Sequence, residues 1–171
     1  MDKKKSVFVI VLVLLFGVVC FISFSNSIKI KNVDNDNFKI NYDSTWKLSN
    51  TNDGVLLIHK KSKATLDIKC KILDDTFIDT NLDDLIDDIM YSVKEQNSDY
   101  HLISIEEDIN DKYDSYSYLY EKDNEQVLVN VYKKDTKLVI AYYSCESDYF
   151  DIVLDSVDSI FDSLEILVGE K

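Results

Sequence analysis

The chain has 171 residues, of which 46% are hydrophobic and 30% are charged, and its formal net charge is −13 at pH 7. A field of that sign repels nucleic acid, so a nucleic-acid partner is excluded. The 3 cysteines form no CxxC motif and no Cys/His pair at metal-ligand spacing, so we expect neither a metal site nor another cofactor.

The first candidate element is the uncharged stretch Val7–Phe24, which is 18 residues long. At about 1.5 Å per helical residue it spans most of a bilayer's hydrocarbon core of about 30 Å. The lysines at positions 3–5 precede it and favour a cytoplasmic N-terminus. We therefore expect residues 1–27 to form a cytoplasmic stub, a transmembrane anchor in the lipid bilayer and a short exit segment. Residues 28–171 then form one extracytoplasmic domain.

A cleaved secretory signal is the alternative interpretation of this stretch. Signal cores run 7–15 residues and end in a small-x-small site. The serines at 23, 25 and 27 provide two weak sites of that kind. Cys20 follows Val19 and lies inside the apolar run, which argues against lipidation. Under both interpretations the following domain is exported, and cleavage would make it a secreted protein.

The exported part is the more acidic part of the chain. Four of the 19 lysines and one of the 32 acidic residues lie in positions 1–29, so 15 lysines face 31 acids in the remainder. A solvated acidic surface explains this balance, and cationic partners are its functional alternative.

The first half of the domain is predicted to be mostly β-structure. Phe38–Tyr42 alternates apolar and polar residues, and so does Leu66–Ile72, where Cys70 falls on the apolar side. A further strand is predicted at Val55–His59, and a first one through Ile28, Ile30 and Val33. The acidic turn at 34–37 lacks the glycine and glutamate of an EF-hand loop. Trp46 is expected to anchor the edge of the sheet against a helix.

Helical spacing then predicts an amphipathic helix over Thr80–Gln96. Its outer face carries four aspartates, at 83, 84, 87 and 88. Weak binding of a divalent cation is possible there, but a solvated helix face is the simpler interpretation.

Four strands at close spacing follow, separated by short polar turns, and must be antiparallel. A second amphipathic helix starts near Ser147 or Asp148. The predicted strands are Tyr100–Ile109, Tyr113–Glu121, Gln126–Lys133 and Leu138–Cys145.

The pattern Phe38-x-Ile40-x-Tyr42-x-x-x-Trp46 resembles the opening strand and turn of PsbP-like domains of bacterial surface proteins. The order of elements over Ile30–Val168 is similar to theirs, although Asp43 stands where those domains have a proline. The resemblance implies an α+β fold, with a central antiparallel sheet and amphipathic helices on its faces, an α/β/α sandwich. It also implies an accessory or binding role with no standard catalytic residues.

The candidate chemical groups are few. Cys70 and Cys145 are a possible disulfide outside the cytoplasm, and two free buried thiols are the alternative. His59 and His101 are the only histidines, and neither lies in a hydrolase motif, so no catalytic residue is predicted.

Tyrosines are the candidate ligand-binding residues. Tyr116, Tyr118 and Tyr120 alternate along one strand, and Tyr132 and Tyr142 (or Tyr143) fall on neighbouring strands. Such a platform can stack on sugar rings or a peptide, while a half-buried sheet accounts for the same pattern.

The sequence thus favours a membrane-anchored, extracytoplasmic accessory or binding domain without catalytic activity. Its partners are expected to be the bilayer and a membrane or cell-surface protein. A cell-envelope enzyme with an unrecognised site and a structural subunit of a membrane complex remain the alternatives.

Overall fold

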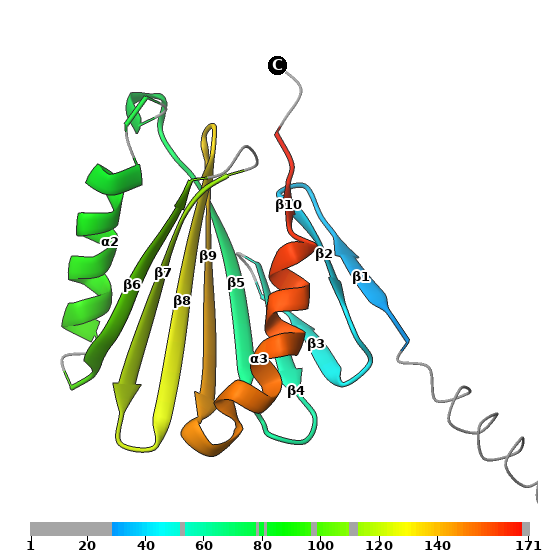
Figure 1. The fold of residues 1–171 in the computed structure, drawn as a ribbon. Helices are drawn as coiled ribbons and strands as arrows, with labels where there is room; N and C mark the ends of the chain where they lie inside the picture. Colours follow the sequence, from blue (N-terminus) through cyan, green and yellow to red (C-terminus); the bar gives the residue numbers. More distant parts are fainter. Residues whose placement is uncertain are drawn as a thin grey trace, which may run out of the picture.

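A computed structural model describes residues 29–51, 54–77, 79–80, 82–96, 99–109 and 113–168. These residues form a seven-stranded sheet, a smaller three-stranded sheet and two α-helices (Figure 1). The strands of the large sheet are β3 (Trp46–Asn50), β4 (Gly54–His59), β5 (Thr65–Ile72), β6 (His101–Ile109), β7 (Asp114–Lys122), β8 (Glu125–Lys134) and β9 (Lys137–Glu146). The remaining elements are β1 (Lys31–Asp34), β2 (Phe38–Tyr42), the 3-10 turn η1 (Asp75–Phe77), α2 (Leu82–Gln96), α3 (Ser147–Asp162) and β10 (Glu165–Ile166).

The large sheet runs in the order β3-β4-β5-β9-β8-β7-β6 and is antiparallel throughout. Strands β6 to β9 form the predicted meander, because short connections, four residues between β6 and β7 and two residues at each later turn, let each strand fold back on the one before. Strand β5 joins it by pairing with β9, so that Leu66 lies opposite Tyr143. The α+β class and the central antiparallel sheet are therefore confirmed.

Strand β9 shows how the three layers arise. Its odd-numbered residues, from Val139 to Cys145, pack in the same cluster as Phe150, Val153 and Val157 of α3. Its even-numbered residues, from Leu138 to Tyr142, pack in a second cluster with Leu82 and Ile86 of α2. Because successive side chains of a strand point to opposite faces, the two helices cover opposite faces of the sheet.

The small sheet extends the layer that holds α3. Strand β2 pairs with β1 on one side and with β10 on the other, and Ile166 lies opposite Phe38. Asn35 makes the turn before β2, since its side-chain oxygen accepts hydrogen bonds from the backbone nitrogens of Asn37 and Phe38, both at 2.9 Å. The sequence analysis did not predict β3 or β10, and β1 begins at Lys31, whereas the predicted strand included residues before it.

The expected anchor Val7–Phe24 lies outside the described residues. Within the described part of the chain, no helix has both the length and the apolar character needed to cross a membrane.

Gly54 leads to a prediction about stability. A Cβ atom at this position would lie 1.9 Å from the carbonyl oxygen of Ile68, on the neighbouring strand. That oxygen is backbone and cannot swing away, so Gly54→Ala must push β4 from β5. We expect a loss of about 2–3 kcal/mol in the free energy of unfolding, measured by denaturant titration of the full chain. Ser49→Ala on the exposed edge strand is the control and should change it by less than about 0.5 kcal/mol. Equal free energies of unfolding for Gly54→Ala and Ser49→Ala would contradict the close contact between Gly54 and Ile68.

Candidate functional site

The predicted tyrosine platform lies beneath α2. Tyr116, Tyr118 and Tyr120 form a stacked ladder on β7, with ring centroids 6.2 and 6.5 Å apart. Tyr142 joins the same side, because it lies opposite Val129, which in turn lies opposite Tyr118. The hydroxyl of Tyr116 donates to Asp83 and that of Tyr120 to the sulfur of Met90, both on α2.

Tyr132 does not belong to this group. It packs in the α3 cluster, where it makes an edge contact with Tyr113 at 6.1 Å between ring centroids. Tyr143, which the sequence analysis gave as the alternative to Tyr142, also faces α3 and is fully buried. A single platform containing Tyr132 is therefore wrong, because the register of β7 and β8 sends that side chain to the opposite face.

Burial is the main cause of the raised pKa of three of these tyrosines, whereas the hydrogen bond to Asp83 is the main cause for Tyr116. Tyr118 is only 2% exposed. Burial raises its pKa to about 12, with smaller contributions from Tyr120 and two aspartates of α2. Burial also raises the pKa of Tyr142. Tyr118 and Tyr120 are buried in the packing surface of α2, so a ligand would reach these two rings only if α2 left the sheet, whereas Tyr116 and Tyr142 are half-buried.

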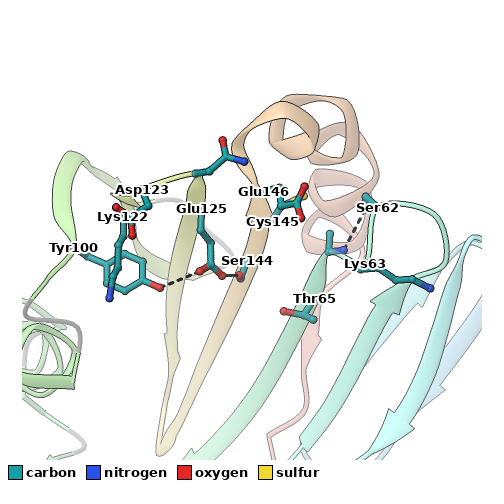
Figure 2. A pocket seen from close by; sticks show the side chains of 12 residues that line it. Ser62, Lys63, Thr65, Tyr100, Lys122, Asp123, Glu125, Ser144, Cys145 and Glu146 are labelled. Carbon is teal, nitrogen blue, oxygen red and sulfur yellow. Dashed lines mark hydrogen bonds between the residues drawn. The ribbon is translucent and has the colours of Figure 1, made fainter.

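A polar cavity of about 630 Å³ lies at the end of the sheet where β7 turns into β8 (Figure 2). Its centre is Glu125, whose carboxylate accepts hydrogen bonds from the hydroxyls of Tyr100, at 3.2 Å, and of Ser144. Lys122 lies over the Tyr100 ring at 5.3 Å and forms a 3.2 Å ion pair with Asp99. The pKa of Tyr100 is raised, first by burial and then by Glu125. Tyr100, Lys122, Glu125 and Ser144 of this cavity, here called the end cavity, are thus already bound to neighbouring side chains.

His59 and Asp43, the two groups that a catalytic relay would need here, are also hydrogen-bonded to their neighbours. His59 Nδ1 lies 2.7 Å from the hydroxyl of Ser62, and burial lowers the pKa of His59. The carboxylate of Asp43 instead accepts hydrogen bonds from Thr45 and Ser156. His59, the last residue of β4, is therefore hydrogen-bonded to the turn that follows and does not form a Ser-His-Asp relay with these groups. His101, at the start of β6, is exposed.

Cys70 and Cys145 are free thiols. Cys70 lies opposite Val139 in the β5–β9 ladder, and Cys145 lies six residues further along β9. At about 3.3 Å per residue the two are about 20 Å apart, which is too far for a disulfide. Burial raises the pKa of both thiols, so neither is activated as a nucleophile.

A second hollow, here called the α3 groove, runs between α3 and strands β6–β8. It consists of two adjoining cavities of about 620 and 300 Å³ that share Glu106, Ser117, Asn130 and Asp158 in their walls. In Figure 1, α3 crosses the side of the sheet near β9 and β5 and leaves β6 and β7 without a helix in front of them. The sequence analysis missed this groove, although Asn130 signals it as a polar residue inside the apolar run Val127–Val131.

No group of three metal-ligating side chains is present among the described residues. The sequence predicts that four aspartates of α2 face outward, and all four are exposed: Asp83, Asp84, Asp87 and Asp88.

The fold is that of a PsbP-like domain. The structure is similar to the solution structure of cyanobacterial PsbP (CyanoP) from Synechocystis sp. PCC 6803, with a TM-score of 0.66 at 16% identity. That alignment covers 82% of this chain and 94% of the cyanobacterial one. The fold that the sequence resemblance implied is therefore confirmed.

Two other solved structures share this fold. LpqN of Mycobacterium tuberculosis, described as involved in cell envelope biogenesis, matches at TM-score 0.60 and 8% identity, over 84% of this chain and 94% of its own. The Ran-binding protein Mog1p of Saccharomyces cerevisiae matches at TM-score 0.59 and 6% identity, over 82% and 96%. No family model and no curated protein matches the sequence. At these identities the likeness defines the fold.

Proposed function

We propose that this protein is a membrane-anchored, extracytoplasmic binding domain that works as an accessory module without catalysis. The observation that carries the proposal is the PsbP-like fold placed directly after an uncharged stretch of 18 residues. In this proposal residues 1–27 hold the anchor and residues 28–171 form the domain on the outer side. Neighbours described as a cell-envelope protein and as a Ran-binding protein support a binding role at the level of the fold.

The end cavity supports binding over catalysis. A general base or nucleophile needs a free, suitably tuned group within reach of its partner. Here Glu125 is held by two hydroxyls, and the pKa of the Cys145 thiol is raised by burial. An enzyme with an unfamiliar site is the alternative, and it would have to use other groups.

The exposed edge of β6 supports a protein partner. Leu102, Ile103 and Ile105 are about half exposed on this terminal strand of the large sheet. An edge strand with exposed apolar side chains can pair with another chain.

Membrane topology is the first test of the proposal. The full-length chain with a C-terminal epitope is expressed in bacteria, and spheroplasts are treated with protease. We expect the protease to digest the epitope in intact spheroplasts. Without protease, the protein should keep its full mass and stay in the membranes after alkaline washing. The control Val13→Lys places a charge inside the apolar stretch and should weaken membrane retention. A protected epitope would overturn the outward orientation, and a shorter soluble product would establish secretion instead.

Partner capture tests the binding role. Mild crosslinking of the full-length protein in its own membranes is followed by purification and mass spectrometry. A stoichiometric protein would support the accessory role, while substrate turnover by the purified chain would overturn the non-catalytic proposal.

A further inference from the structure

The α3 groove is lined by hydrogen-bond acceptors and carboxylates. Glu106 reaches it from β6, and Asp158 and Asp162 reach it from α3. Asp158 and Asp162 are four residues apart, so they project from the same side of the helix. The described residues form no ion pair with any of these three carboxylates. The pKa of Asp158 is raised by burial and by the neighbouring aspartates 162 and 155, so negative charge here is unfavourable without a cation.

Asn130 provides a second, independent sign of a ligand. Its side chain is in the wall of both cavities, yet the residue is only 6% exposed. The amide nitrogen donates to the hydroxyl of Tyr132 at 3.3 Å, while the amide oxygen finds no hydrogen-bond partner among the described residues. Leaving a buried acceptor unsatisfied costs about 1–3 kcal/mol. A donor that enters the groove would remove that cost.

The groove also has an apolar end. Leu119, Leu128 and Leu154 line the smaller cavity, next to the shared residues Asn130 and Asp158. An apolar wall leading to carboxylates matches a long side chain with a methylene stem and a cationic head. Lysine and arginine have that shape, and they carry donors without acceptors, which suits Asn130.

We propose that the α3 groove binds a lysine or arginine side chain from an extended basic segment of a partner protein. The cationic head lies between Glu106, Asp158 and the free oxygen of Asn130, and the stem lies on the leucines. The segment itself runs beside β6, whose outer edge is the end of the sheet and carries Glu106. The inference deepens the proposed binding function and rests on it, since it names the chemistry of the partner.

The test uses the full-length chain in a nonionic detergent and a fluorescent peptide, acetyl-Lys-Val-Lys-Val-Lys-amide, with binding followed by anisotropy. We expect binding that weakens as salt rises. Asn130→Leu and Asp158→Asn should each weaken it at least 10-fold. Asp84→Asn, an exposed change of the same charge on α2, should change it less than 2-fold.

Asn130→Leu is the decisive variant, because it changes no charge. A chain with net charge −13 attracts any cationic peptide, but that general attraction is the same before and after this substitution. Leucine has nearly the shape of asparagine and removes the unsatisfied oxygen, so we expect unchanged or higher thermal stability. Weaker binding by a protein of equal stability would therefore locate the peptide in the groove.

Two results would overturn the proposal. The first is equal affinity of the wild type, Asn130→Leu and Asp158→Asn, which would leave only attraction by net charge. The second is equally tight binding of N-acetyl-lysine amide, which would make the groove a site for small free amines. Either result leaves the outward topology and partner capture untouched. A captured partner that Asn130→Leu retains would keep the binding function and remove it from this groove.

Discussion

Trp46→Ala is expected to remove about 3–5 kcal/mol from the free energy of unfolding. Trp46 is fully buried at the start of β3, where its ring lies 5.2 Å from that of His59. Its indole nitrogen donates to the hydroxyl of Ser156 on α3 at 2.9 Å, and Ser156 donates to Asp43 at 2.9 Å. The indole thus joins the end of the large sheet to the helix, as the sequence analysis expected. Because small domains have about 5–15 kcal/mol in total, this loss is a large part of the stability.

The measurement is urea unfolding of the full-length chain followed by far-ultraviolet circular dichroism, since the variant lacks the only tryptophan. Ser156→Ala is the matched control, because it keeps the ring and removes the hydroxyl that accepts from the indole N–H group and donates to Asp43. A loss of about 1–3 kcal/mol is expected from that control. If Trp46→Ala costs less than Ser156→Ala, the ring is not the main link between β3 and α3.

The local pattern predicted most of the secondary structure, because the apolar period differs between strands and helices. The alternation in Leu66–Ile72 corresponds to β5, and the spacing around Phe150 corresponds to α3. Strand β10 had no such signal, since its two residues are a strand only because they pair with β2, more than 120 residues earlier. A contact of that range is absent from any local pattern.

The candidate site was harder to predict, because it depends on register. Tyr116 and Tyr132 lie on adjacent strands, but Tyr116 pairs with Val131, so the two tyrosines point to opposite faces. A shift of one residue would have placed them together. Register also separates Cys70 from Cys145. Their strands β5 and β9 pair, but Cys70 lies opposite Val139 and not opposite Cys145. The α3 groove depends on where α3 stops covering the sheet, which the sequence does not encode locally.

Ile86→Asp is expected to release α2 from the sheet, at a cost of about 3–5 kcal/mol for that unit. Ile86 is 6% exposed and packs in the cluster that holds Tyr118 and Tyr120. A carboxylate placed there would be buried without a cation, whereas the α3 cluster on the opposite face would keep its contacts. Hydrogen exchange should therefore show lost protection in α2 and retained protection in β5 and α3. Asp84→Asn, on the exposed side of α2, should leave protection unchanged.

The tyrosines report the same event independently. The pKa of Tyr118 is raised to about 12, first by burial and then by Tyr120, Asp87 and Asp83. A raised folded-state pKa stabilises the wild type below about pH 10, and this contribution is lost as the pH rises toward 12. In Ile86→Asp the phenol becomes exposed and should ionise near pH 10, which absorbance at 295 nm detects. Loss of hydrogen-exchange protection over the whole domain would show that the α2 and α3 faces of the sheet do not open independently. A sugar or peptide that binds this variant and not the wild type would show that α2 covers a stacking surface.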